Sequence, residues 1–144
     1  MMKKLLLYAL AASIILFIIV VAPFRSSPPA PTVKAGHTTV QTTEGSYCWN
    51  GLTSSECVDT AYTSIEDMAK EHTPTTVAPS ETISVHFKDA PNVTVSETID
   101  GKSSDVPLTN NQFNATKTPG TYIYSVSADW ERGRGFYVFS VRIK

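Results

Sequence analysis

The last 25 residues, Gly120–Lys144, constrain the fold of this chain more than any other stretch. Two runs rich in tyrosine, valine, phenylalanine and isoleucine flank a short polar link that contains glycine, which is the pattern of a β-hairpin. Alternate side chains of a strand point to the same side. Tyr122, Tyr124, Val126 and Ala128 therefore share one face of the first arm, and Tyr137, Phe139, Val141 and Ile143 form the natural inward face of the second.

Shorter β-like runs precede this hairpin. Ile83, Val85 and Phe87 alternate with polar residues, and further short apolar runs follow between Val93 and Ala115. Proline, glycine, asparagine and aspartate separate these runs, a spacing that favours a sandwich over an α/β fold. We therefore expect a mainly β, immunoglobulin-like β-sandwich with one short helix over residues 42–144.

The start of the hairpin carries a second indication of that fold. Gly120-Thr121-Tyr122 has the spacing of the tyrosine corner of immunoglobulin-like domains, in which a tyrosine near a strand start hydrogen-bonds backwards. Tyr124 then occupies the place of the second cysteine of antibody domains. The inter-sheet disulfide of those domains is therefore absent.

One short helix is expected after residue 62. Thr63 and Glu66 have capping-box spacing, and Pro74 ends the segment. The apolar stripe of this helix comprises Ile65, Met68 and Ala69.

The N-terminus predicts a membrane anchor or a signal segment over residues 1–25. Leu5–Ala22 contains no charge and follows Lys3 and Lys4. As a helix these residues would span about 27 Å, close to the roughly 30 Å hydrocarbon core of a bilayer. We expect a single-pass anchor with the C-terminal domain outside the cell membrane, or secretion after signal cleavage. Both alternatives place the rest of the chain outside the membrane.

Residues 26–41 are expected to form a Pro-rich linker. Pro28, Pro29 and Pro31 fix the backbone and remove donors, so the segment should be an extended spacer outside any helix or central strand.

The chain contains two cysteines, Cys48 and Cys57. In an exported domain such a pair predicts one disulfide, whereas its spacing disfavours a metal site or a redox-active pair. No metal or cofactor is expected.

Several short motifs in a fixed order resemble a group of small, uncharacterised exported or lipid-anchored bacterial proteins. They comprise Gly45-Ser46-Tyr47-Cys48-Trp49, Cys57-x-Asp59, Pro79, Ile83-x-Val85-x-Phe87, Phe113, the Gly120-x-Tyr122-x-Tyr124-x-Val126-x-Ala128-x-Trp130 run, and Gly135-x-Tyr137-x-Phe139-x-Val141. The resemblance implies an exported β-rich domain with a disulfide, and it implies no activity. This chain departs from the group because it lacks a cysteine just after the apolar run.

No catalytic constellation is evident, so we expect a non-catalytic interaction or sensory module rather than an enzyme. From Ser26 onward 9 basic residues face 13 acidic ones, a net charge of −4 that gives no reason to bind nucleic acid. The partner would be an unknown envelope protein or cell-wall polymer. The candidate contact residues are Trp130, Glu131, Arg132 and Arg134 at the hairpin tip. Trp130 either contacts that partner or folds back over the core.

A second hypothesis is an extracytoplasmic enzyme or small-ligand-binding protein. Its site would lie near the Cys48–Cys57 loop and use Tyr47, Trp49, Asp59 and Tyr62.

Overall fold

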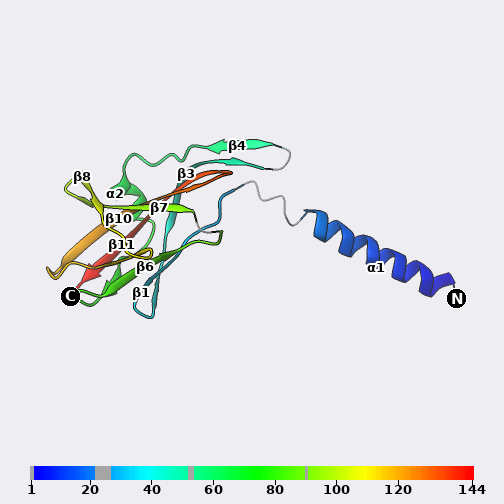
Figure 1. Ribbon diagram of the computed structural model, residues 1–144, viewed down its shortest axis with the longest axis horizontal. Coiled ribbons are helices and arrows are strands. Elements are labelled where there is room, and N and C mark those ends of the chain that lie inside the picture. The colour runs from blue at the N-terminus through cyan, green and yellow to red at the C-terminus, as the bar shows by residue number, and fades with distance from the viewer. Residues whose placement is uncertain (1, 22–26, 52–53, 90) are drawn as a thin grey trace.

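The computed structural model describes residues 2–21, 27–51, 54–89 and 91–144, which form one N-terminal helix and a mainly β domain (Figure 1). In the first sheet, the spatial order is β2 (Thr38–Val40), β1 (Thr32–Ala35), β6 (Thr82–His86) and β9 (Gln112–Asn114). In the second, it is β4 (Ser55–Val58), β3 (Thr43–Asn50), β11 (Gly133–Ile143), β10 (Gly120–Trp130), β7 (Asn92–Ile99) and β8 (Lys102–Val106). These neighbours pair antiparallel, and β5 (Thr75–Val77) joins the second sheet parallel to the end of β11.

Both sheets contribute to one hydrophobic core. The first sheet supplies Val33, Ala35, Val40, Ile83, Val85 and Phe113, and the second supplies Val95, Tyr124, Val126, Ala128, Tyr137, Phe139, Val141 and Ile143. Full burial of each large apolar side chain contributes about 1.5–3 kcal/mol. The predicted mainly β fold is confirmed.

The β10–β11 hairpin lies at the centre of the second sheet, and both of its predicted faces are confirmed. Tyr124 pairs with Phe139 and Val126 with Tyr137, and all four side chains are buried. Tyr124 stacks on Phe139 with ring centroids 5.3 Å apart and lies 5.0 Å from Phe113 of the first sheet. Aromatic contacts thus join the two sheets at the middle of this hairpin.

Tyr122 makes the backward hydrogen bond that the tyrosine-corner spacing predicts. Its phenol donates a hydrogen bond of 3.0 Å to the carbonyl oxygen of Thr118, four residues earlier. This bond holds the loop before β10 against the strand.

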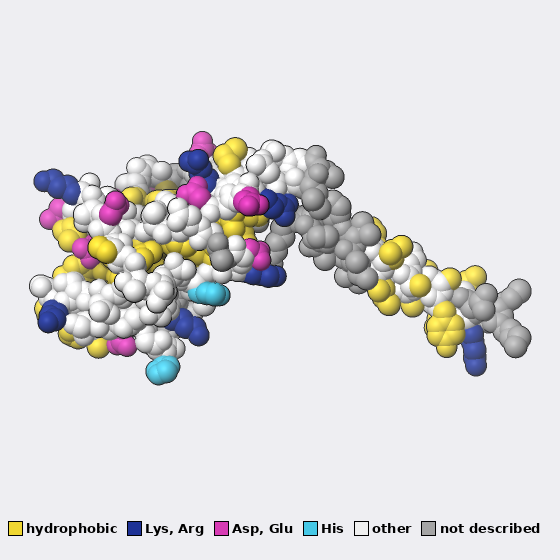
Figure 2. Space-filling view, in the orientation of Figure 1, with side chains coloured by type: hydrophobic (Ala, Val, Ile, Leu, Met, Phe, Trp, Pro, Cys, Tyr) yellow, Lys and Arg dark blue, Asp and Glu magenta, His cyan; other side chains and the backbone are white. Residues whose placement is uncertain are grey.

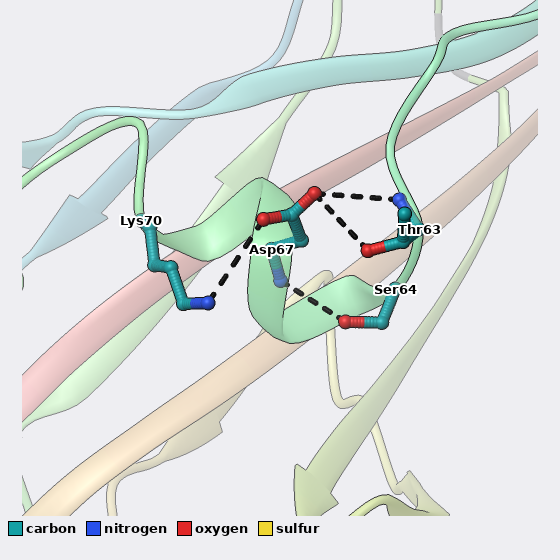
Figure 3. Close-up of polar contacts among 4 residues, drawn as sticks. All are labelled: Thr63, Ser64, Asp67 and Lys70. Atoms are coloured by element: carbon teal, nitrogen blue, oxygen red, sulfur yellow. Dashed lines mark hydrogen bonds and ion pairs between the residues drawn. The ribbon is translucent and has the colours of Figure 1, made fainter.

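The short helix α2 (Ile65–Ala69) packs on the outer face of the second sheet. Its N-cap is Ser64, whose hydroxyl accepts a hydrogen bond from the Asp67 N–H at 3.1 Å (Figure 3). Asp67 Oδ2 accepts bonds from the backbone N–H and the hydroxyl of Thr63, each at 3.3 Å. The predicted Thr63–Glu66 capping box is therefore wrong by one residue, because the N-cap is Ser64 and the residue three positions later is Asp67.

The expected spacer over residues 26–41 also needs correction. β1 lies inside the first sheet between β2 and β6, and Val33 and Ala35 point into the core. The prolines end at Pro31, one residue before the strand begins, so they do not interrupt its hydrogen bonds. The four residues Thr32–Ala35 alternate between polar and apolar, and this short pattern suffices for a strand because β6 pairs with the segment.

The predicted disulfide is confirmed. Cys48 and Cys57 lie directly opposite each other on β3 and β4 and are bonded, with their Cα atoms 4.0 Å apart. Both residues are solvent-exposed, so the bond ties the hairpin together at the surface.

Helix α1 (Met2–Val21) stands clear of the two sheets, and apolar side chains line its described surface (Figures 1 and 2). Leu6, Leu7, Tyr8, Leu10 and Ile14–Phe17 are each 53–77% exposed. Among the described residues, no helix has the length and apolarity that a membrane crossing requires. The uncharged run predicted from the sequence ends at Ala22, and that residue and the following Pro23–Ser26 lie outside the described residues.

Candidate functional site

The tips of two hairpins meet at one end of the second sheet. We call this region the hairpin end and define it by Trp49 and Asn50 of β3 together with Trp130, Glu131 and Arg132 at the β10–β11 turn. Figure 1 shows both tips at the end of the domain from which the chain leads to α1, opposite the C-terminus.

Glycine at position 133 allows the two tips to touch. Gly133 pairs with Trp49 and adopts a φ of 147°, a conformation that other residues rarely adopt. A Cβ atom at this position would collide with the carbonyl oxygen of Cys48. The Asn50 N–H donates a 2.7 Å hydrogen bond to the carbonyl oxygen of Arg132 beside this contact.

Four aromatic rings form a continuous chain beneath the hairpin end. Trp49 meets Trp130 edge to face at 5.4 Å, and Trp130 meets Phe87 in the same manner at 5.3 Å. Phe87 follows β6 of the first sheet and lies 5.6 Å from Tyr137 of the second. Trp130 is partly buried and packs against the core, in agreement with the alternative that it folds back.

Arg132 lies over this aromatic chain and remains exposed. Its guanidinium carbon is 5.4 Å from the centre of the Trp49 ring, and its Nε donates a 3.0 Å hydrogen bond to the Asn50 carbonyl oxygen. Cation–π contacts of exposed arginines contribute about 0.5–1 kcal/mol. The geometry fixes the orientation of an exposed cation at the hairpin end.

An open cavity of about 410 Å³ lies beside these residues. Its lining comprises Trp49, Asp89, Asp129, Trp130, Glu131 and Arg132. Three carboxylates and one guanidinium surround two indole rings, which gives the lining a formal charge of −2. Asp129 also forms an exposed ion pair of 3.8 Å with Arg134, of a kind that contributes little to stability.

Both indole nitrogens of the hairpin end lack an acceptor. Nε1 of Trp49 and Nε1 of Trp130 are buried and make no hydrogen bond within the part of the chain that the structure describes. An unsatisfied buried N–H costs about 1–3 kcal/mol, and native proteins contain few such groups. Local destabilisation of this kind concentrates at functional sites.

The second candidate site is only partly assembled. Tyr47 and Asp59 line a shallow cavity of about 300 Å³ with the Cys48–Cys57 bond and Arg134. Trp49 is buried in the aromatic chain instead, and Tyr62 does not line the cavity. Desolvation and the carboxylates of Glu56 and Glu44 raise the pKa of Tyr47 above its ordinary value.

The residues of the two predicted sites are therefore distributed differently in the structure. Trp49 joins Trp130, Glu131 and Arg132 at the hairpin end, whereas Arg134 lies between the two cavities and lines the one with Tyr47 and Asp59. Sequence reasoning missed Phe87 and Asp89 as members of the site. The alternation of Ile83, Val85 and Phe87 placed Phe87 inward, but no sequence signal connected it to Trp130.

No three histidine, cysteine, aspartate or glutamate side chains gather as metal ligands within the described ranges. In comparisons with protein-family models, with curated proteins and with solved structures, nothing matches this chain.

Proposed function

We propose that this chain is a non-catalytic interaction or sensory module, attached to a membrane by its N-terminal segment, and that its partner contacts the hairpin end. The observation that carries the proposal is the arrangement of Glu131 and Arg132, two exposed charged side chains on a rigid floor formed by Trp49 and Trp130. Aromatic and arginine side chains dominate binding energies at protein interfaces, and preorganisation lowers the entropy cost of binding.

The charged and aromatic groups at this end suit recognition. The six residues that line its cavity supply carboxylates, a guanidinium and indoles, which bind through charge, hydrogen bonds and stacking. None of the six is a serine, cysteine, lysine or histidine, so the lining supplies no residue of these types to act as a nucleophile or a base beside its three carboxylates.

The sequence and the exposed surface of α1 support membrane attachment. Leu5–Ala22 carries no charge, and large apolar side chains cover the described surface of the helix. Exposed apolar area of this kind marks contact with another protein or with lipid. Lys3 and Lys4 favour a cytoplasmic N-terminus, and the Cys48–Cys57 disulfide is typical of an oxidising compartment outside it.

We also propose that the two sheets form an immunoglobulin-like sandwich. The Tyr122–Thr118 hydrogen bond is the contact that a tyrosine corner makes. Tyr124 fills the place of a core cysteine with an aromatic contact between the sheets. Such a scaffold presents its loops at two ends, and the hairpin end is one of them.

Site-specific photo-cross-linking in the native membrane tests the proposed contact. A photoreactive amino acid at position 131 is expected to capture a discrete partner, whereas one at position 117, an exposed lysine before β10, is expected to capture none. Arg132→Ala should abolish the capture at position 131 without unfolding the chain. Equal capture at both positions, or capture that survives Arg132→Ala, would contradict the proposal.

The alternative, a small-ligand site near Cys48–Cys57, is favoured by one observation. Tyr47, Asp59 and Arg134 present a phenol, a carboxylate and a guanidinium to one cavity. Native mass spectrometry of the purified chain distinguishes the alternatives, because a stoichiometric small molecule lost on Asp59→Ala would support the ligand site.

A further inference from the structure

The segment between α1 and the first strand is part of the folded domain. Pro28 and Pro29 are buried, and a Cβ atom at Gly135 would lie only 3.1 Å from Pro28 Cγ. The Tyr137 phenol donates a buried 3.1 Å hydrogen bond to the Pro29 carbonyl oxygen. These contacts fix the point at which the chain enters the domain.

That entry point lies beside the hairpin end. Gly133 pairs with both Trp49 and Trp130 at the tip. Gly135, which lies against Pro28, is two residues further along β11, so about 7 Å of strand separates Pro28 from the tip. β1 leads away from the entry point, and the C-terminus lies at the opposite end of the domain (Figure 1). The start of β10 is at that opposite end too, because Gly120 pairs with Ile143, and Lys117 precedes it by three residues.

Covalent geometry limits the distance from the entry point to α1. Val21 and Ser27 are six residues apart, and a fully extended chain of that length covers at most about 22 Å. The domain therefore has no long stalk, in contrast to the spacer that the prolines suggest. Whatever surface surrounds the end of α1 lies within this distance of the residues beside the hairpin end.

We infer that the hairpin end faces and contacts the lipid headgroups of the membrane that holds α1, so that the partner proposed above would meet this end at the membrane surface. The inference rests on the membrane attachment proposed above. With α1 in a bilayer, the short connection brings this end of the domain to the headgroup layer. The opposite end, with Lys117, points away from it.

The charges of the hairpin end suit a zwitterionic surface. Within and beside it, the exposed cations are Lys88, Arg132 and Arg134, and the exposed carboxylates are Asp89, Asp129, Glu131 and Glu56, which lies opposite Trp49 on β4. These charges sum to −1, so contact does not depend on attraction to anionic lipids or on low salt. Tryptophan and arginine have apolar bodies with polar ends, which suit the boundary between water and lipid.

The two tryptophans of the chain provide a direct test, because both lie at the hairpin end. The full-length chain is reconstituted into phosphatidylcholine vesicles with and without brominated acyl chains, which quench indole emission at short range. We expect the brominated vesicles to remove most of the tryptophan emission, and high salt to leave that loss unchanged.

A matched pair of labelled variants locates the contact. A fluorophore on Arg132→Cys is expected to be quenched, and one on Lys117→Cys is expected to keep its emission. Stronger quenching at position 117 than at position 132, or quenching at neither position with the tryptophans also unquenched, would overturn the inference.

Vesicle flotation separates this inference from the attachment on which it rests. A chain that floats with the vesicles but keeps its tryptophan emission retains the attachment and refutes the inference. A chain that does not float refutes both.

Discussion

The middle and the tip of the β10–β11 hairpin share one inward face but have different surroundings. In the middle, Tyr124, Val126 and Phe139 are covered by the first sheet and are at most 2% exposed. At the tip, the same face continues to the partly buried Trp130, which meets Trp49 and Phe87 edge to face, and charged side chains and a cavity lie beside it. The same alternation of side chains therefore lies in a fully covered core at the middle of the hairpin and beside an open surface at its tip. We therefore assign the middle to the maintenance of the fold and propose the tip as the binding surface.

The largest difference between the two halves should appear on truncation. Phe139→Ala removes a ring buried between the sheets and is expected to lower the free energy of unfolding by about 3–5 kcal/mol. Arg132→Ala at the tip should cost at most about 1 kcal/mol, because its contacts are exposed. Urea unfolding of the full-length chain measures the free energy of unfolding of both variants. Similar losses for the two variants would show that the middle and the tip do not differ in their contribution to stability.

Loss of the disulfide should have the next largest effect. Cys48→Ala with Cys57→Ala is expected to lower the free energy of unfolding by about 2.5–3 kcal/mol, as the chain-entropy estimate gives for a short loop. Reduction of the wild-type chain should reproduce this loss and leave the double variant unchanged. Alkylation that labels either thiol before reduction would show that the bond is not formed.

Tyr137→Phe tests a side chain that lies between the middle and the tip of the hairpin. It removes the buried hydrogen bond to the Pro29 carbonyl oxygen and leaves that oxygen unpaired, which is expected to cost about 1–3 kcal/mol. The chain ahead of β1 should also become accessible to proteases. A variant as stable and as protease-resistant as the wild type would show that Pro29 does not fix the entry of the chain.

Alkaline pH provides a second test of the buried tyrosines. Burial raises the pKa of Tyr137 and of Tyr124 above the ordinary tyrosine value of 10.0, and the Glu97 carboxylate adds to the effect on Tyr124. A phenol whose pKa is higher in the folded state stabilises the fold below pH 10 and loses that contribution as pH rises above it. The free energy of unfolding should therefore fall above about pH 10, less steeply in Tyr137→Phe than in the wild type.

The smallest expected effect is at the start of the hairpin. Tyr122→Phe removes the hydrogen bond to Thr118 from a half-buried side chain and should cost about 1 kcal/mol. Thermal unfolding measures this loss, and Thr121→Ser is the control, because it keeps the hydroxyl that accepts a hydrogen bond from Arg142 Nε. A loss as large as that of Phe139→Ala would mean that the corner, and not the middle of the hairpin, maintains the fold.

The sequence predicted local features well and long-range ones poorly. Alternation placed Tyr124 and Phe139 inward, and the cysteine count predicted the disulfide, because each of these signals lies within a short stretch. The strand at Thr32–Ala35 was missed because its four residues follow three prolines and depend on pairing with β6. The contact between Trp49 and Trp130 was missed because β11 brings together residues 81 positions apart.

Hydrogen exchange of the full-length chain in its native membrane, compared with the same chain in detergent, most directly tests the division of the hairpin. We expect amides 129–134 at the tip to gain protection in the membrane, whereas amides 118 and 120–122 at the opposite end should exchange equally in both conditions. Protection gained at 118 and 120–122 and not at 129–134 would contradict this division, because the covered surface would then be the end that we assign to the fold alone.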